Sequence, residues 1–174
     1  PGDRLEWADP EFDDSAWEIA ADTRLFPHNL PASGWQGIGW FRLHLLVDSS
    51  LKNTSLALRL YHPGASEVYL DGKLIYRFGK VGASEAEEKP HWGLYPKVIH
   101  FETPGQHLIA VRYSGFSALA FAKLGFPMGF GMVLGDLNRS MKDRADLIKK
   151  SITYQMFFFG IPLAVAVVHL FLFI

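Results

Sequence analysis

Six residues of types that recognise sugars stand in predicted loops or at the ends of predicted strands. The apolar face of a pyranose stacks on an aromatic ring, and its hydroxyls bond to planar polar side chains. The candidate ligand-binding residues are Trp35, Gln36, His62, Arg77, Trp92 and Tyr95. A tryptophan can equally pack in a core, and this is the role we expect for Trp17 and Trp40. For Trp35 and Trp92, which stand beside glycines, both roles are open.

The sequence offers little support for catalysis. It contains no cysteine, no G-x-S-x-G or H-E-x-x-H motif, and no two histidines four residues apart. The carboxylates Glu85, Glu87 and Glu88 fall in a glycine- and proline-bounded segment, where we expect a solvated loop. We therefore predict a protein that is not an enzyme. A structural calcium ion is conceivable at Asp9, Asp13 and Asp14, because calcium prefers oxygen ligands.

Composition limits the partners and the domain count. The chain has 174 residues, 49% of them hydrophobic and 20% charged, with a formal net charge of −1. This length suits one domain and an appendage. The chain lacks a basic block that could follow a phosphate backbone, so nucleic acid is not expected as a partner.

Alternating apolar and polar residues predict a series of short strands. The alternation covers 40–47 and 56–61, and a hairpin is predicted from 67–70 and 73–78 around Asp71-Gly72. Another pair of strands is predicted at 97–101 and 107–113, and the last strands at 116–121 and 128–134. Short strands separated by turn residues are typical of an antiparallel sandwich, so the fold class is mainly β.

The stretch from Met156 to Ile174 predicts a membrane helix. No acidic or basic residue follows Lys150, and 19 helical residues extend about 28 Å, close to the thickness of a bilayer's hydrocarbon core. Gly160 and Pro162 are tolerated in such spans. The alternative is a buried core helix of a soluble domain. Because the sequence starts at Pro1 and stops within apolar residues, we expect a piece of a longer membrane protein.

A second helix is predicted before this span. Asp136 can cap it, and its apolar residues recur every three or four positions from Leu137 to Ile152. No glycine or proline interrupts 137–159, so one helix can continue into the membrane. The expected organisation is a ligand-binding domain at 1–135, a coupling helix at 136–155 and the first transmembrane helix at 156–174.

Three segments in the same order resemble galactose-binding-like jelly rolls, such as those that precede the catalytic barrel of β-galactosidases and β-glucuronidases. They are DPEFDDSAW at 9–17, GWFR at 39–42 and GASEVYLDGKL at 64–74. The resemblance implies a jelly-roll β-sandwich.

The C-terminal part resembles the bacterial seven-transmembrane receptors with diverse intracellular signalling modules. It is carried by GFP at 125–127, VLG at 133–135, the charged helix, and the stretch from Phe159-Gly160 to HLFLF at 169–173. Val168 stands where this family often has tyrosine. The resemblance implies an extracytoplasmic sensor at residues 1–150 that binds a small ligand, with carbohydrate as one candidate. The further partners would be the remaining transmembrane helices and an intracellular signalling module.

One pattern opposes this orientation. Basic residues precede the span at Arg139, Lys142, Arg144, Lys149 and Lys150, and the positive-inside rule places such residues in the cytoplasm. An exported domain and six further spans could override it. The alternatives are a non-catalytic sugar-binding accessory domain of a glycosidase and a protein-interaction jelly roll. A glycosidase would continue into a catalytic barrel with paired carboxylates.

Overall fold

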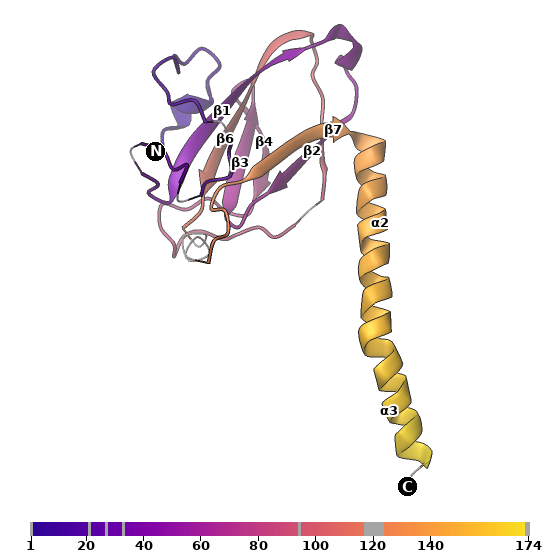
Figure 1. Cartoon of the computed structure of the whole chain (residues 1–174). Helices are drawn as coiled ribbons and strands as arrows, with labels where there is room; N and C mark the ends of the chain where they lie inside the picture. Colours follow the sequence, from indigo (N-terminus) through magenta and orange to yellow (C-terminus); the bar gives the residue numbers. More distant parts are fainter. Residues whose placement is uncertain are drawn as a thin grey trace. The chain divides into compact units, whose positions relative to one another are not determined.

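The computed structural model describes residues 2–20, 22–26, 28–32, 34–93, 95–116 and 124–172. The chain divides after Leu134 into two compact units. The first unit contains the strands except for the last two residues of the final one, and the second contains those two residues and the long C-terminal helix (Figure 1).

The described residues of the first unit form two sheets that are mainly antiparallel, as predicted. A four-stranded sheet has the order β1-β6-β3-β4, and a three-stranded sheet has the order β5-β2-β7. The bounds are β1 (Ile38–Val47), β2 (Leu56–Tyr61), β3 (Ala65–Leu70), β4 (Lys73–Phe78), β5 (Lys97–Ile99), β6 (Gly105–Ser114) and β7 (Gly131–Asp136). Short 3₁₀ turns lie at η1 (Leu5–Ala8) and η2 (Ser49–Leu51).

The β3–β4 hairpin confirms the turn that was predicted from Asp71-Gly72. Both residues have positive φ, 49° at Asp71 and 81° at Gly72, as a type I′ turn requires. The Asp71 carboxylate also accepts a hydrogen bond of 2.8 Å from the backbone N–H of Leu108 in β6. The turn therefore fixes the hairpin and ties it to the neighbouring strand.

Two strand predictions need correction. Residues 97–101 and 107–113 do not pair with each other, because β5 pairs with β2 while β6 lies between β1 and β3. The connection crosses from one sheet to the other, and Phe101 on that connection is buried in the core. The last strand starts at Gly131, because the backbone of Met128 is already bonded outside the sheets to Leu25 and the Tyr113 hydroxyl. The predicted strand 116–121 lies outside the described residues after Phe116.

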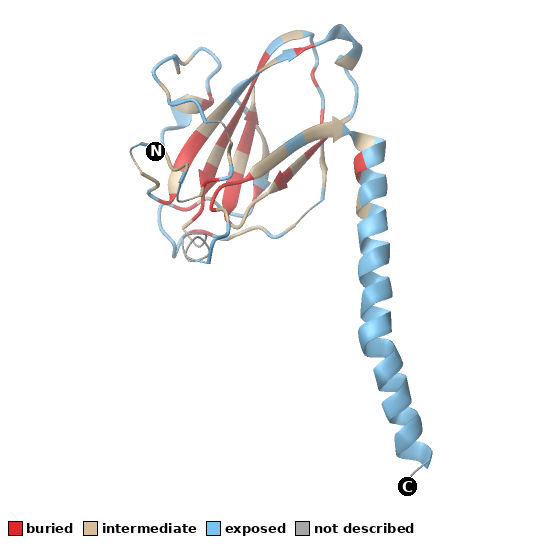
Figure 2. Cartoon of the chain, in the orientation of Figure 1, coloured by how far each residue is buried: buried red, intermediate tan, exposed pale blue. Residues whose placement is uncertain are grey.

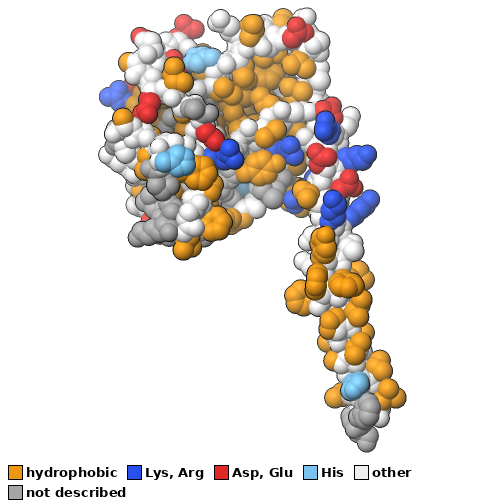
Figure 3. Space-filling view, viewed as in Figure 1, with side chains coloured by type: hydrophobic (Ala, Val, Ile, Leu, Met, Phe, Trp, Pro, Cys, Tyr) orange, Lys and Arg blue, Asp and Glu red, His pale blue; other side chains and the backbone are white. Residues whose placement is uncertain are grey.

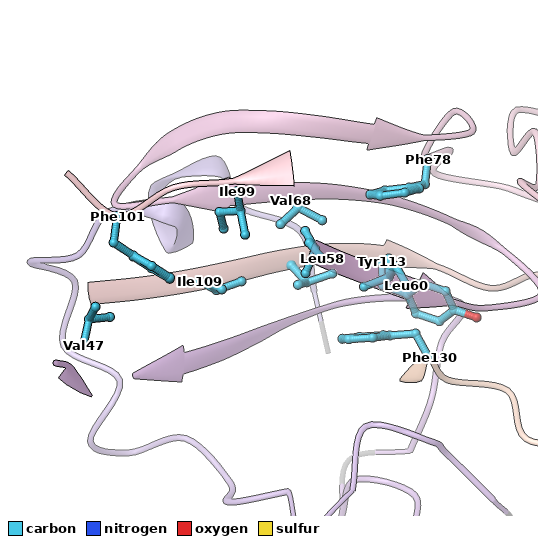
Figure 4. Packing of buried hydrophobic residues seen from close by; sticks show 11 residues of the cluster. Val47, Leu58, Leu60, Val68, Phe78, Ile99, Phe101, Ile109, Tyr113 and Phe130 are labelled. Atoms are coloured by element: carbon cyan, nitrogen blue, oxygen red, sulfur yellow. The ribbon is translucent and has the colours of Figure 1, made fainter. Parts of the chain in front are cut away.

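The main core fills the space between the two sheets (Figures 2 and 4). Alternate residues of β2 and β6 contribute to it, since successive strand residues point to opposite faces. Its buried members are Val47, Leu58, Leu60, Val68, Phe78, Ile99, Phe101, Ile109, Val111, Tyr113 and Phe130.

A second apolar cluster covers the other face of the four-stranded sheet. Its buried members are Ala8, Trp40, Tyr69, Leu108 and Ala110, and Trp7, Trp17 and Leu74 pack against them. Trp17 and Trp40 thus have the packing role that the sequence predicted. The N-terminal segment supplies the cover for this face.

Arg42 fastens that segment to β1. Its guanidinium donates to the backbone carbonyls of Trp7 at 2.6 Å and Asp9 at 2.9 Å, and to the Asp14 carboxylate at 2.6 Å. Only 2% of the Arg42 side chain is exposed. The carbonyls and the carboxylate therefore take the place of the water that would otherwise solvate the guanidinium.

The second unit contains α2 (Leu137–Gln155), the π turn η3 (Met156–Gly160) and α3 (Ile161–Leu172). The Asp136 carboxylate accepts a 2.7 Å hydrogen bond from the N–H of Arg139, which confirms the predicted cap. In η3, the N–H of Ile161 donates to the carbonyl of Met156, five residues earlier. The wider turn stands just before Pro162, which has no N–H to continue the α-helical pattern.

Among the described residues, one helix is long and apolar enough to cross a membrane, judged by length and composition. It comprises the 36 residues Leu137–Leu172. On the face shown in Figure 3, charged side chains lie along the first part of α2 and give way to apolar side chains toward α3. All the residues described in α3 are exposed in the isolated chain (Figure 2).

The core predicts a clear contrast between two leucines. Leu58 is fully buried, whereas Leu46 is 83% exposed. We expect Leu58→Ala to lower the free energy of unfolding by about 2–5 kcal/mol through lost burial and a cavity. Leu46→Ala should change it by less than about 0.5 kcal/mol. Urea unfolding in detergent, followed by tryptophan fluorescence, measures both; equal effects would contradict this assignment of the core.

Candidate ligand-binding site

The first unit has a cavity of about 810 Å³ at the outer face of the three-stranded sheet. Tyr61 and Val133 belong to its floor, because the residues next to them in β2 and β7, Leu60 and Met132, pack toward the core. The described residues that line the cavity come from four separate segments: Asp22, Thr23, Arg24; Tyr61, His62, Pro63; Trp92; and Phe126, Pro127, Gly129, Gly131, Met132, Val133.

Two glycines of the lining have different roles. A Cβ at Gly129 would collide with the backbone carbonyl of Thr23, so glycine is needed there for close packing. A Cβ at Gly131 would meet only the Tyr61 ring, at 3.8 Å, which is an ordinary contact. Gly131 therefore contributes space to the cavity and is not required by a close contact with the backbone.

The charged groups of the lining neutralise each other. The Arg24 guanidinium donates to the Asp22 carboxylate at 2.8 Å and 3.0 Å. These hydrogen bonds lower the pKa of Asp22 and raise that of Arg24. Both side chains stay ionised as a pair, and the pair adds no net charge to the cavity.

His62 is a neutral group at the edge of the cavity. Its Nε2 lies 2.9 Å from the Ser66 hydroxyl, and its Nδ1 is buried without a hydrogen-bond partner among the described residues. The ring lies 5.6 Å from that of Tyr113 and 6.3 Å from that of Phe78. Burial lowers the pKa of His62 to about 4, so the imidazole is uncharged at neutral pH.

The structure brings together two of the predicted ligand-binding residues, His62 and Trp92. Trp35 packs against the core, with its ring 5.7 Å from that of Tyr113 and 6.4 Å from that of Phe41. Gln36 and Tyr95 are exposed and do not line the cavity.

Arg77 lies in β4, and its guanidinium donates to the Glu67 carboxylate at 3.1 Å. Glu67 is the neighbour of the inward-facing Val68 in β3 and pairs with Arg77 across the hairpin, so the Glu67–Arg77 pair lies on the outer face of the four-stranded sheet. The cavity belongs to the other sheet. The six predicted residues therefore do not form one site.

Most of the lining escaped the sequence analysis. In the sequence, Tyr61 occupies a polar position of an alternating strand, and Phe126-Pro127 belongs only to a segment that carries a family resemblance. The contacts that assemble the cavity join residues about one hundred positions apart, such as the Thr23 hydroxyl that donates to the Phe130 carbonyl at 2.5 Å.

The acidic groups do not form a metal site. Asp9 and Asp13 accept hydrogen bonds from the nearby N–H groups of Glu11 and Ser15, and Asp14 pairs with Arg42. The described part of the chain contains no group of three histidine or carboxylate side chains that could hold a metal. The calcium expectation thus finds no ligand cluster at these aspartates.

Glu88 corrects the expectation of a fully solvated acidic loop. Its side chain is buried and accepts a 3.1 Å hydrogen bond from the backbone N–H of Phe116. Glu87 stays exposed and caps the N–H of Ala83 at 3.1 Å. One carboxylate of the loop therefore anchors it to the end of β6.

Searches against family models, curated proteins and solved structures found no match to this chain.

Burial of neutral His62 predicts a loss of stability in mild acid. Its pKa is about 4 in the folded chain against an ordinary value of 6.5, so the unfolded chain takes up the proton first. The neutral His62 imidazole therefore contributes fully to the free energy of unfolding above pH 6.5. This contribution is lost as the pH falls toward 4, and the loss is at most roughly 3 kcal/mol. Urea unfolding between these pH values should show this slope, and His62→Gln should reduce it. An NMR titration that protonates the His62 imidazole near pH 6.5 would contradict the prediction.

Proposed function

We propose that this chain is the sensor part of a membrane signalling receptor. Residues 1–150 lie outside the cytoplasm, in the periplasm of a bacterium, and form a jelly-roll domain with its coupling helix. The cavity binds a small ligand, and the apolar helix carries the signal across the membrane. Further transmembrane helices and an intracellular signalling module complete the receptor.

The observation that carries this proposal is the continuity of β7 with α2. Gly131, Met132 and Val133 of β7 line the cavity, and the last residue of the same strand, Asp136, caps α2. No loop separates the strand from the helix. A ligand that changes the backbone of β7 therefore acts on the start of the helix through a few peptide units.

The helix itself supports a membrane location. From Met156 to Leu172 it contains no acidic or basic residue, and its backbone hydrogen bonds are made within the segment, as lipid requires. The basic residues of α2 would oppose an extracytoplasmic location if they alone set the topology. The resemblance to the seven-transmembrane receptors favours the outward orientation, because an exported domain precedes the first span there.

Signalling further requires that the ligand bind two states of the domain with different affinity. The direct test is hydrogen exchange on the full chain in nanodiscs, after a thermal-shift screen of glycans and small metabolites has given a ligand. Binding should slow exchange in β7 and in the first turn of α2. A ligand that binds without changing exchange in α2 would favour an accessory binding module. Absence of any small ligand would favour a protein-interaction domain.

Two aromatic residues of one loop provide a matched test of the site. Trp92 and Tyr95 are similarly exposed, at 67% and 62%, but only Trp92 lines the cavity. We expect Trp92→Ala to weaken the binding of a ligand from the screen by about tenfold or more, since a large stacking surface is lost. Tyr95→Ala should leave the affinity unchanged. Equal affinities of the two variants, with both folded, would place the site elsewhere.

The coupling helix predicts a dependence on rotation. Two residues inserted after Arg144 turn the following helix by about 200°, whereas seven inserted residues restore its facing to within about 20°. In a receptor that carries this chain, the first insertion should abolish ligand-dependent output and the second should retain it. Normal output from the two-residue insertion would exclude rigid coupling through α2.

A further inference from the structure

We infer that the ligand of this cavity is an uncharged molecule with an aromatic ring system, and not a charged metabolite or an oligosaccharide. This inference rests on the proposed function, because it names the ligand class of the same site. It follows from the charge, the hydrogen bonding and the shape of the lining.

Among the described residues of the lining, the two charged side chains, Asp22 and Arg24, are paired with each other. The Arg24 guanidinium donates to both carboxylate oxygens of Asp22, at 2.8–3.2 Å. His62 is held neutral by burial among aromatic rings. An anion or cation that enters would lose part of its hydration and would meet an exposed pair whose opposite charges largely cancel, so it would gain little net attraction in return.

Two polar side chains of the lining are already bonded within the protein. The Thr23 hydroxyl donates to the Phe130 carbonyl at 2.5 Å, and the Nε2 of His62 is engaged with the Ser66 hydroxyl. The planar polar groups that the sequence suggested, Gln36 and Arg77, are not part of the lining. The polar partners that the described lining leaves to a sugar are the Asp22–Arg24 pair and the Tyr61 hydroxyl, which are few for the many hydroxyls of an oligosaccharide.

The apolar part of the lining includes exposed aromatic residues. The rings of Trp92 and Phe126 are 67% and 59% exposed, and Tyr61 adds a third ring with a hydroxyl. Aromatic side chains bind other rings through large contact areas and offset or edge-on packing. A cavity of about 810 Å³ lies within the range of sites for drug-sized molecules.

Two fluorescent probes with the same ring system test the charge. 1-N-phenylnaphthylamine is uncharged, and 1-anilinonaphthalene-8-sulfonate adds a sulfonate. The full chain is placed in nanodiscs of zwitterionic lipid, and the signal of empty nanodiscs is subtracted. We expect saturable binding of the uncharged probe, about tenfold tighter than that of the anionic probe. An excess of maltose should not displace it.

Two substitutions in the same sheet test the location. Gly131→Leu fills the cavity next to Tyr61 and should lower the affinity for the uncharged probe by about tenfold or more. Val98→Leu adds bulk at a partly exposed position of β5 outside the lining and should leave binding unchanged. Far-ultraviolet circular dichroism checks that both variants are folded. If Gly131→Leu does not fold, Trp92→Ala serves in its place.

The outcomes separate this inference from the proposed function. Equal or tighter binding of the anionic probe, or displacement by maltose, would overturn the ligand class. So would failure of the uncharged probe to bind, or binding that Gly131→Leu does not weaken. The sensor role is judged by a different measurement, the change of hydrogen exchange in α2 when a ligand from the screen binds, and can survive each of these results.

Discussion

Burial of strand β6 on both faces is the constraint on which the first unit depends. Ile109, Val111 and Tyr113 point into the core between the sheets, whereas Leu108 and Ala110 point to the opposite face. A strand of this kind requires apolar cover on two sides. The three-stranded sheet covers one side and the N-terminal segment covers the other, so two distant parts of the chain are held by one central strand.

The N-terminal cover explains where the charges of this unit are. Arg112 of β6 donates to Asp3 at 2.5 Å and to Glu67 at 3.0 Å, and Arg42 bonds to the backbone of the covering segment. The hydrogen bond from Arg112 lowers the pKa of Asp3; burial tends to raise that of Glu67, but hydrogen bonds from Arg112 and Tyr69 outweigh it. Ion pairs thus hold the outer face of one sheet, while the cavity on the other sheet is lined mainly by apolar groups.

The sequence predicted those features that depend on neighbouring residues. The positive φ angles at Asp71-Gly72, the alternation in β1 and β2 and the cap at Asp136 each follow from a few adjacent side chains. The crossing of Phe101 between the sheets and the assembly of the cavity depend on contacts between distant segments, which no local pattern encodes. Trp35 and Trp92 show the limit well: both stand beside glycine, yet one packs on Tyr113 and the other is exposed.

The junction of β7 and α2 has the energy scale that a switch requires. Allosteric coupling typically amounts to about 1–3 kcal/mol, and an aspartate cap contributes about 0.5–2 kcal/mol to a helix. A ligand that moves the end of β7 enough to weaken the bond between Asp136 and the Arg139 N–H therefore changes the helix start by an amount comparable to the coupling. The π turn before Pro162 is a second position where the helical hydrogen-bond pattern already departs from the α-helix, and such turns often occur at functional sites. In the receptor proposed above, a rotation imposed by a change at the cap would be relayed or absorbed at this turn, so the two ends of α2 would together determine what the apolar helix receives.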